Sequence, residues 1–271
     1  MDVLLFQGGK DTLDGLADGL DRSQVYGTCR PFQAVHLAKN DFDDFALSGG
    51  GWRLLNLDNY RYLGPWLAER GYALLAVTHR LATPERKTYP EAVDDVRAAL
   101  RFARTDAKLG IDPERIALMG DSSGAHLAAL VALTEKQPVK AVIGVYGVYD
   151  LAAQWRHDQL SRPRDHIVER FLGASLIDDR RIYFDASPIS YVSAKNNSIA
   201  FLLAWGTADD VVDHHTQSVA FLEALKQAGH YARPAVLEGA PHFWIGDPLD
   251  EQGSHSAFLA HRLLRFLQAK V

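Results

Sequence analysis

Apolar runs alternate with helix-like patterns along the chain from residue 72 onward. Nearly continuous apolar runs predict buried strands at 72–78, 115–119, 139–146 and 199–205, with a shorter strand at 232–237. Apolar residues at helical spacing predict helices at 89 to about 108, 123 to about 135, 213–228 and 254–269. This alternation predicts an α/β fold, with a mostly parallel central sheet and helices on both faces.

Two regions depart from the alternation. Residues 150–195 contain a polar stretch rich in Arg and Asp (WRHDQLSRPRDH), which predicts a small insertion over the carboxyl edge of the sheet. It either covers a pocket there or forms a surface excursion. Near the N-terminus, 33–38 and 42–47 are candidate strands, although Asp43 and Asp44 make the second unusually polar. We expect residues 1–271 to form a single domain.

Composition narrows the choice of partners and compartment. Of the 271 residues, 47% are hydrophobic and 23% charged, and the net charge of −5 comes with dispersed Lys and Arg, which argues against nucleic-acid or anionic-membrane partners. The lone Cys29 excludes an intramolecular disulfide and fits a reducing compartment. The Met1-Asp2 start has only a short apolar run, unlike a signal peptide, and no segment reaches the ~18 apolar residues of a membrane span. We therefore expect a cytoplasmic protein, and a homo-oligomer is compatible with these features.

A G-x-S-x-G motif provides a candidate nucleophile. Gly120-Asp121-Ser122-Ser123-Gly124 lies between a predicted strand and an Ala/Leu-rich helix, the context in which this motif exposes a reactive serine. The helix N-terminus would face an oxyanion formed by attack of Ser122, and the backbone N–H of Ser123 would be one donor. The alternative is a helix-capping serine in a glycine-rich turn, which we consider less favoured in this context.

A serine hydroxyl needs a histidine base, and the base needs a carboxylate. His242 is the favoured base because it lies in a loop between the last predicted strand and the last helix. The other candidates lie on or at the start of predicted helices, where surface or packing roles are expected: His126, His214, His215, His255 and His261.

The acid is expected after the strand at 199–205, where Asp209 and Asp210 are adjacent. Asp209 is preferred because it comes first after the Gly-Thr-Ala turn, which leaves Asp210 or Asp213 to cap the following helix. Both aspartates being caps is the remaining alternative.

A glycine-rich segment, Ser48-Gly49-Gly50-Gly51-Trp52, predicts an oxyanion hole. Consecutive glycines let backbone N–H groups point into a cavity, so we expect Gly50 and Gly51 to donate together with Ser123. A glycine-rich hairpin is the alternative. Trp52, Phe243 and Trp244 flank the proposed site and are candidate substrate contacts, although aromatic residues are as often part of a core.

These motifs resemble the hormone-sensitive-lipase-like esterases and the related feruloyl-esterase and kynurenine-formamidase branch of the α/β-hydrolases. The similarity covers residues 48–269 and includes YALLAVTHRLA, YPEAVDDVR and LGIDPERIALMGDSSG. It implies a triad of Ser122, Asp209 and His242. The chain departs from the family pattern where Ser48 replaces a histidine that normally braces the glycine loop, and where Asp43-Asp44 replaces apolar strand residues.

Three functions are consistent with these residues. The first is a serine esterase that cleaves a small carboxylic ester through an acyl-enzyme; the second is an arylformamidase-type amide hydrolase with the same triad. A panel of p-nitrophenyl acetate and N-formylkynurenine would separate them. The third is a non-catalytic binding protein with this fold, which fluorophosphonate labelling would exclude. None of them requires a cofactor or metal, and no His or carboxylate pair has a spacing that requires one.

Overall fold

The computed structural model describes residues 2–7, 34–36, 50–54, 57–105 and 112–271. Within these ranges, seven strands form one sheet in the order β2-β3-β1-β4-β5-β6-β7. Their bounds are β1 Asp2–Gln7, β2 Ala34–His36, β3 Tyr72–Val77, β4 Ile116–Asp121, β5 Ala141–Val145, β6 Ala200–Gly206 and β7 Ala232–Leu237. Strands β4 to β7 are mutually parallel, whereas β1 is antiparallel to both β3 and β4, and β2 is antiparallel to β3. The expected mostly parallel sheet is confirmed.

The strand predictions differ from the structure mainly at the N-terminus. The five strands expected after residue 72 are present, and β2 lies inside the predicted 33–38. Strand β1 was not expected, because four apolar residues after Met1-Asp2 give too short a pattern. The candidate strand at 42–47, with Asp43 and Asp44, lies outside the described residues.

Helices connect these strands and cover the sheet. They are α2 Leu63–Ala68, α3 Glu91–Thr105, α4 Ser123–Thr134, α5 Leu151–Ser161, α6 Ile167–Leu172, α7 Arg180–Ala186, α8 Ala220–Gln227 and α9 His255–Lys270. Short 3₁₀ segments occur at η1 Leu57–Tyr60, η3 Pro188–Tyr191 and η4 Ala194–Asn196, and a π-helical segment, η5 His215–Val219, leads into α8. Among the described residues, no helix combines the length and apolar character needed to cross a membrane.

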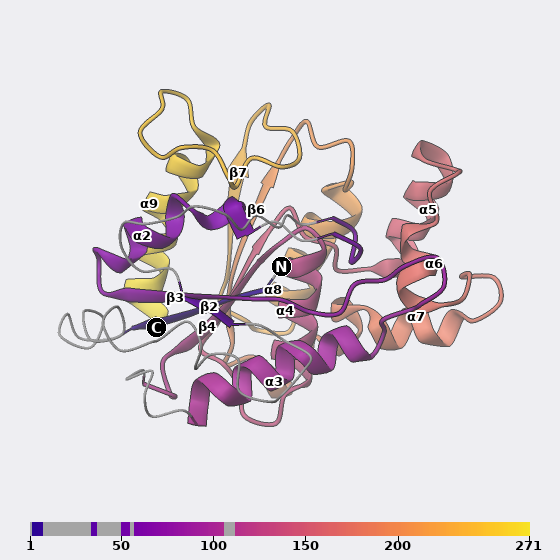
Figure 1. Ribbon diagram of the computed structural model, residues 1–271, viewed down its shortest axis with the longest axis horizontal. Helices are drawn as coiled ribbons and strands as arrows, with labels where there is room; N and C mark the ends of the chain where they lie inside the picture. The colour runs from indigo at the N-terminus through magenta and orange to yellow at the C-terminus, as the bar shows by residue number, and fades with distance from the viewer. Residues whose placement is uncertain (1, 8–33, 37–49, 55–56, 106–111) are drawn as a thin grey trace.

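The sheet separates two hydrophobic clusters. Helices α2 and α9 cover one face, and α3, α4 and α8 cover the other (Figure 1). Strand β6 shows the alternation that produces this arrangement, since Phe201 and Leu203 belong to one cluster and Leu202 and Ala204 to the other. Burial on both faces explains why β4, β5 and β6 are nearly continuously apolar, whereas the edge strand β7 contains exposed positions such as Arg233.

The segment between β5 and β6 is the expected insertion. It contains α5, α6 and α7, which extend to one side of the sheet in Figure 1. The Asp150 carboxylate caps α5 by accepting hydrogen bonds from the N–H groups of Ala152 and Ala153, at 2.9 and 3.0 Å. Gln217 of η5 accepts from the Tyr149 and Asp150 N–H groups, at 2.7 and 2.9 Å. These bonds fix the start of α5 beside the carboxyl edge of the sheet.

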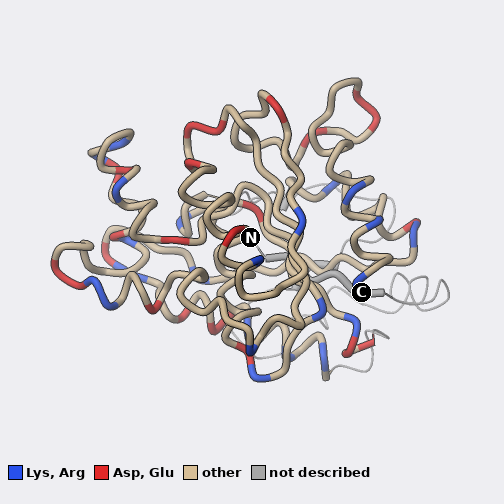
Figure 2. Tube along the Cα trace, turned by 180° about the vertical axis from the view of Figure 1, so that it is seen from behind, with Lys and Arg blue, Asp and Glu red and all other residues tan. Residues whose placement is uncertain are grey.

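Charged residues are distributed over the whole molecule. Viewed from behind, Lys and Arg are interspersed with Asp and Glu along the described trace rather than gathered in one block (Figure 2). This distribution agrees with the dispersed charges in the sequence.

Candidate active site

Ser122 occupies a sharp turn between β4 and α4. Its φ of 52° and ψ of −120° are unfavourable for a residue with a Cβ, and the Ser122 N–H donates to the Val145 carbonyl at 2.9 Å. The turn requires glycine nearby, because a Cβ on Gly120 would lie 2.4 Å from the carbonyl carbon of Gly124. The motif glycines therefore allow the strand and the helix to approach closely, and Ser122 stands at their junction.

His242 links this serine to Asp209. The His242 Nε2 lies 3.1 Å from Ser122 Oγ, and its Nδ1 lies 2.6 Å from Asp209 Oδ2. The side chains of His242 and Asp209 are 2% and 1% exposed, so water competes little for this pair. The loop after β7 and the loop after β6 thus bring together the three residues that the sequence singled out.

Asp209 is held by backbone donors as well as by the histidine. Its Oδ1 accepts hydrogen bonds from the N–H groups of Val211 and Val212, both at 2.9 Å, which leaves Oδ2 directed at His242. Asp210 is exposed, and its backbone carbonyl lies 3.3 Å from the His157 ring. The capping role falls to Asp213, whose carboxylate accepts from the N–H groups of His215 and Thr216.

A buried polar cluster lies behind His242. The Tyr146 ring packs against the His242 ring with centroids 4.4 Å apart, and the Tyr146 hydroxyl lies 3.5 Å from the Asp121 carboxylate. Asp121 also accepts from the Tyr60 hydroxyl at 2.8 Å and from Asn59 Nδ2 at 3.2 Å. Burial, followed by the nearby Asp121 charge, raises the pKa of Tyr146 well above its ordinary value, so this hydroxyl stays protonated at neutral pH. Sequence reasoning missed this cluster.

The glycine loop lies beside the nucleophile. Gly50, Gly51 and Ser123 all line the same cavity as Ser122. Gly51 has a φ of 58°, and a Cβ there would lie 2.5 Å from a methyl group of Ile167 on α6. Glycine is therefore required for the loop to pass under the insertion. Ser48, the residue that departs from the family pattern, lies outside the described residues.

Trp52 anchors the end of this loop in the core. It is 2% exposed, and its indole N–H donates to Nδ1 of the buried His126 at 3.1 Å. His126 Nε2 in turn donates to the Ala186 carbonyl at 2.8 Å, and the indole stacks on Phe171 with ring centroids 4.6 Å apart. Burial lowers the pKa of His126 to about 4, so the ring is neutral at pH 7 and its Nδ1 can accept the hydrogen bond from the indole N–H. Trp52 thus connects the glycine loop, α4 and the insertion.

The cavity in front of Ser122 has a volume of about 320 Å³. The insertion contributes Gln154, Asp158, Arg162 and Ile167 to its lining, so this segment covers part of the pocket rather than forming only a surface excursion. The polar members lie at four-residue spacing along one face of α5 and just beyond its end. That i, i+4 spacing is visible in the sequence and is the signal by which these three residues could have been predicted to share one face.

The three predicted aromatic contacts are in different environments. Phe243 lines the cavity and is 57% exposed, and Trp52 contributes to the lining although its ring is buried. Trp244 is placed elsewhere, because it is 2% exposed and packs edge-on against Tyr146 in the cluster under α9. Its position gives no support to a substrate contact. Among the described residues, no group of three or more His, Cys, Asp or Glu side chains is arranged to hold a metal ion.

The fold and this site define the class of protein: an α/β-hydrolase with a serine, a histidine and an aspartate in line at the carboxyl edge of the sheet. The BD-FAE family profile matches residues 45–225, and the chain belongs to this family. The resemblance to α/β-hydrolase esterases is thereby confirmed.

Named relatives and a solved structure agree with this class. Esterase LipQ of Mycobacterium tuberculosis is 33% identical over 67% of this chain and 45% of its own length. An ethyl acetate hydrolase of Pseudomonas putida is 30% identical over 72% of this chain and 64% of its own length. The chain spans about half the length of the first curated relatives it matches. A bifunctional acetyl ester-xyloside hydrolase of Caldicellulosiruptor lactoaceticus shares the fold, with a TM-score of 0.71 and 20% identity over 92% of this chain and 93% of that one.

Proposed function

We propose that this protein is a serine hydrolase of carboxylic esters. The observation that carries the proposal is the continuous hydrogen-bonded line from Ser122 Oγ through His242 to Asp209, with separations of 3.1 and 2.6 Å. These separations are within the range needed for proton transfer from a serine to its base. The esterase names of the relatives favour an ester over an amide substrate.

Each residue of the site has one role in the proposed reaction. Ser122 Oγ forms a bond to the acyl carbon while His242 Nε2 takes the hydroxyl proton, and Asp209 orients the ring and stabilises its positive charge. The oxyanion accepts hydrogen bonds from the N–H groups of Gly50, Gly51 and Ser123. The ester C–O bond then breaks and His242 returns the proton to the leaving alcohol. Water repeats the sequence on the acyl-enzyme and releases the acid.

A covalent probe tests this function directly. A fluorophosphonate should form an adduct located by mass spectrometry on Ser122, and the adduct should be absent in Ser122→Ala. Hydrolysis of p-nitrophenyl acetate should be lost in the same variant. A wild-type protein that is folded, reacts with no such probe and hydrolyses no ester would contradict the proposal. Faster cleavage of N-formylkynurenine than of p-nitrophenyl acetate would instead favour the amide reaction.

A further inference from the structure

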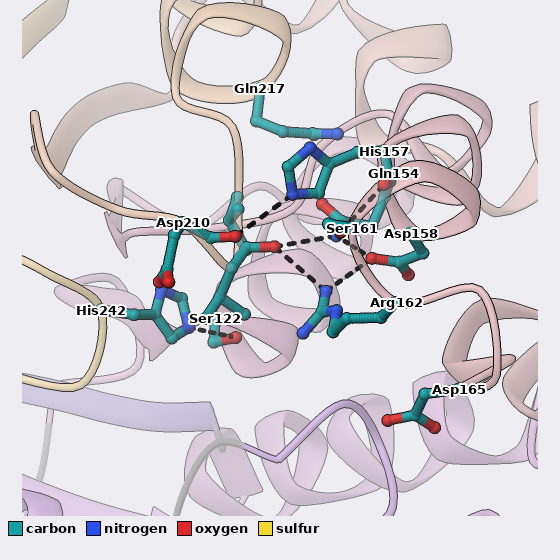
Figure 3. Close-up of polar contacts among 12 residues, drawn as sticks. Ser122, Gln154, His157, Asp158, Ser161, Arg162, Asp165, Asp210, Gln217 and His242 are labelled. Atoms are coloured by element: carbon teal, nitrogen blue, oxygen red, sulfur yellow. Dashed lines mark hydrogen bonds and ion pairs between the residues drawn. The ribbon is translucent and has the colours of Figure 1, made fainter.

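A guanidinium lies across the cavity from the nucleophile. Arg162 follows the last turn of α5, and its side chain is 28% exposed. Figure 3 shows the guanidinium end of this side chain directed toward the side on which Ser122 lies, and both residues line the same cavity. Neither ester cleavage nor the proposed triad requires a cation at this place.

The protein holds this guanidinium by one nitrogen. Arg162 Nη2 donates to Asp158 Oδ1 at 2.5 Å and to the Val211 carbonyl at 3.1 Å. Gln154 Nε2 donates to the same Asp158 oxygen at 2.8 Å and to the same Val211 carbonyl at 3.1 Å. Asp158 and Val211, both held in turn by Gln154, therefore fix the orientation of the Arg162 side chain before any ligand arrives.

The remaining donors of Arg162 have no protein acceptor within the described part of the chain. Nε is buried without a hydrogen-bond partner there, and no hydrogen bond or ion pair among the described residues involves Nη1. An apolar substrate group placed against Arg162 would remove water from Nη1 and return no hydrogen bond, which is unfavourable. The cavity therefore favours a substrate that brings an acceptor of its own.

The charged residues that line the cavity indicate which acceptor group a substrate would bring. Its lining, as far as the structure describes it, contains two cations, Arg53 and Arg162, and one carboxylate, Asp158. The Asp158 side chain is only 5% exposed, whereas the Arg53 and Arg162 side chains are 32% and 28% exposed. Arg53 already forms a two-pronged pair with Asp165, at 2.8 Å for each bond. A ligand thus meets cationic donors, with the open donor on Arg162, and a carboxylate is the group that matches a guanidinium best.

Resting on the proposed function, we propose that the substrate carries a carboxylate in addition to the ester, and that Arg162 binds it. The same cavity is also lined by the apolar residues Val148, Ile167 and Val212. The site would thus take a half-ester or an acylated hydroxy acid in which a short apolar spacer separates the anion from the scissile bond. Arg162 is a specificity-determining residue in this assignment.

Matched pairs of esters test the assignment. One pair places the anion in the leaving group, with 4-acetoxybenzoate against its methyl ester. The other places it in the acyl group, with mono-4-nitrophenyl glutarate against the corresponding terminal amide. For at least one pair, wild-type kcat/KM should favour the acid by about tenfold at pH 7.5, as expected for one charge-assisted hydrogen bond. Arg162→Gln should reduce this preference to about onefold, because it removes the charge but keeps a polar side chain.

Arg164→Gln is the matched control. Arg164 is exposed, lies two residues away and carries the same charge, but does not line the cavity. It should leave the acid preference at the wild-type value. Equal losses in the two variants would mean that the net field, and not contact, selects the anion, and would overturn the assignment. No preference for either acid in the wild type, or a preference that survives Arg162→Gln, would also overturn it.

Binding separates this inference from the proposed function. If the wild type cleaves no ester, calorimetry with glutarate and with glutaramide still decides the matter. Tighter binding of glutarate that disappears in Arg162→Gln would support the anion site while the hydrolase proposal failed. Equal binding of the two compounds would overturn the anion site. Circular dichroism and thermal unfolding of each variant verify that it is folded.

Discussion

The two sides of Ser122 differ in how their polar groups are satisfied. On the side of His242, both ring nitrogens of the histidine, both oxygens of Asp209 and both oxygens of Asp121 have protein partners. On the side of α5, Gln154 Oε1 and Arg162 Nε are buried without a partner in the described structure. The saturated hydrogen bonds of His242, Asp209 and Asp121 fix the geometry of these three side chains, whereas unsatisfied groups beside a cavity are suited to a ligand. The first side is thus built for reaction and the second for recognition.

The largest effect on kcat is expected from removing the nucleophile or its base. Ser122→Ala and His242→Ala should each lower kcat for p-nitrophenyl acetate by on the order of 10³ or more, because nucleophile and base act as a unit. Steady-state kinetics measure the loss of kcat in each variant. The double variant tests whether the two residues act together. If the two changes together lowered kcat by the product of the single effects, the residues would be acting independently, contrary to the hydrogen bond between them.

The adjacent aspartates provide a matched pair for the next effect. Asp209→Asn should lower kcat by on the order of 10² or more, because the amide no longer fixes the required tautomer of His242. Asp210→Asn should change kcat less than about twofold, since this side chain is exposed. The two variants differ by one position and have the same charge change. A large loss in Asp210→Asn with near-normal activity in Asp209→Asn would reverse the assignment of the acid.

Short-range patterns explain what the sequence revealed of this site. Ser122 was predictable because its motif joins a strand to a helix, and His242 and Asp209 because each follows a strand that ends at the same edge of the sheet. Trp244 was harder, since its neighbour in sequence lines the cavity while its own ring packs on Tyr146. The partner of Trp52 was also hidden, because His126 is 74 positions away and a pattern shows spacing but not pairing.

The Trp52 anchor of the glycine loop allows a smaller and more selective disturbance of the site. Trp52→Phe keeps a ring to stack on Phe171 but removes the donor to His126, which leaves a buried nitrogen unsatisfied. We expect kcat to fall by about tenfold with little change in KM, because a looser glycine loop stabilises the oxyanion less well. Trp66→Phe on α2 is the control, because it lies on the other face of the sheet, packed against His261. A rise in KM with unchanged kcat would place Trp52 in substrate binding instead.

The smallest effect concerns the dependence of stability on pH. Burial lowers the pKa of His126 to about 4, below the ordinary 6.5 expected in the unfolded chain. The unfolded chain therefore takes up this proton first as the pH falls. The contribution to the free energy of unfolding is complete above about pH 6.5 and is lost progressively down to about pH 4, by at most about 1.4 kcal/mol per pH unit. Burial also lowers the pKa of His79 to about 3, so this residue likewise reduces the free energy of unfolding as the pH falls.

A comparison of variants isolates the His126 part. His126→Gln can still accept the indole proton of Trp52 but does not titrate, so its free energy of unfolding should fall less steeply from pH 6.5 to 4.5 than that of the wild type. His261→Gln removes an exposed histidine from α9 and should keep the wild-type slope. Urea unfolding at intervals across this range measures all three slopes. Equal slopes for His126→Gln and the wild type would show that the pKa of His126 is not lowered by folding. The ring would then become charged below about pH 6.5 and could not accept the hydrogen bond from Trp52 that anchors the glycine loop.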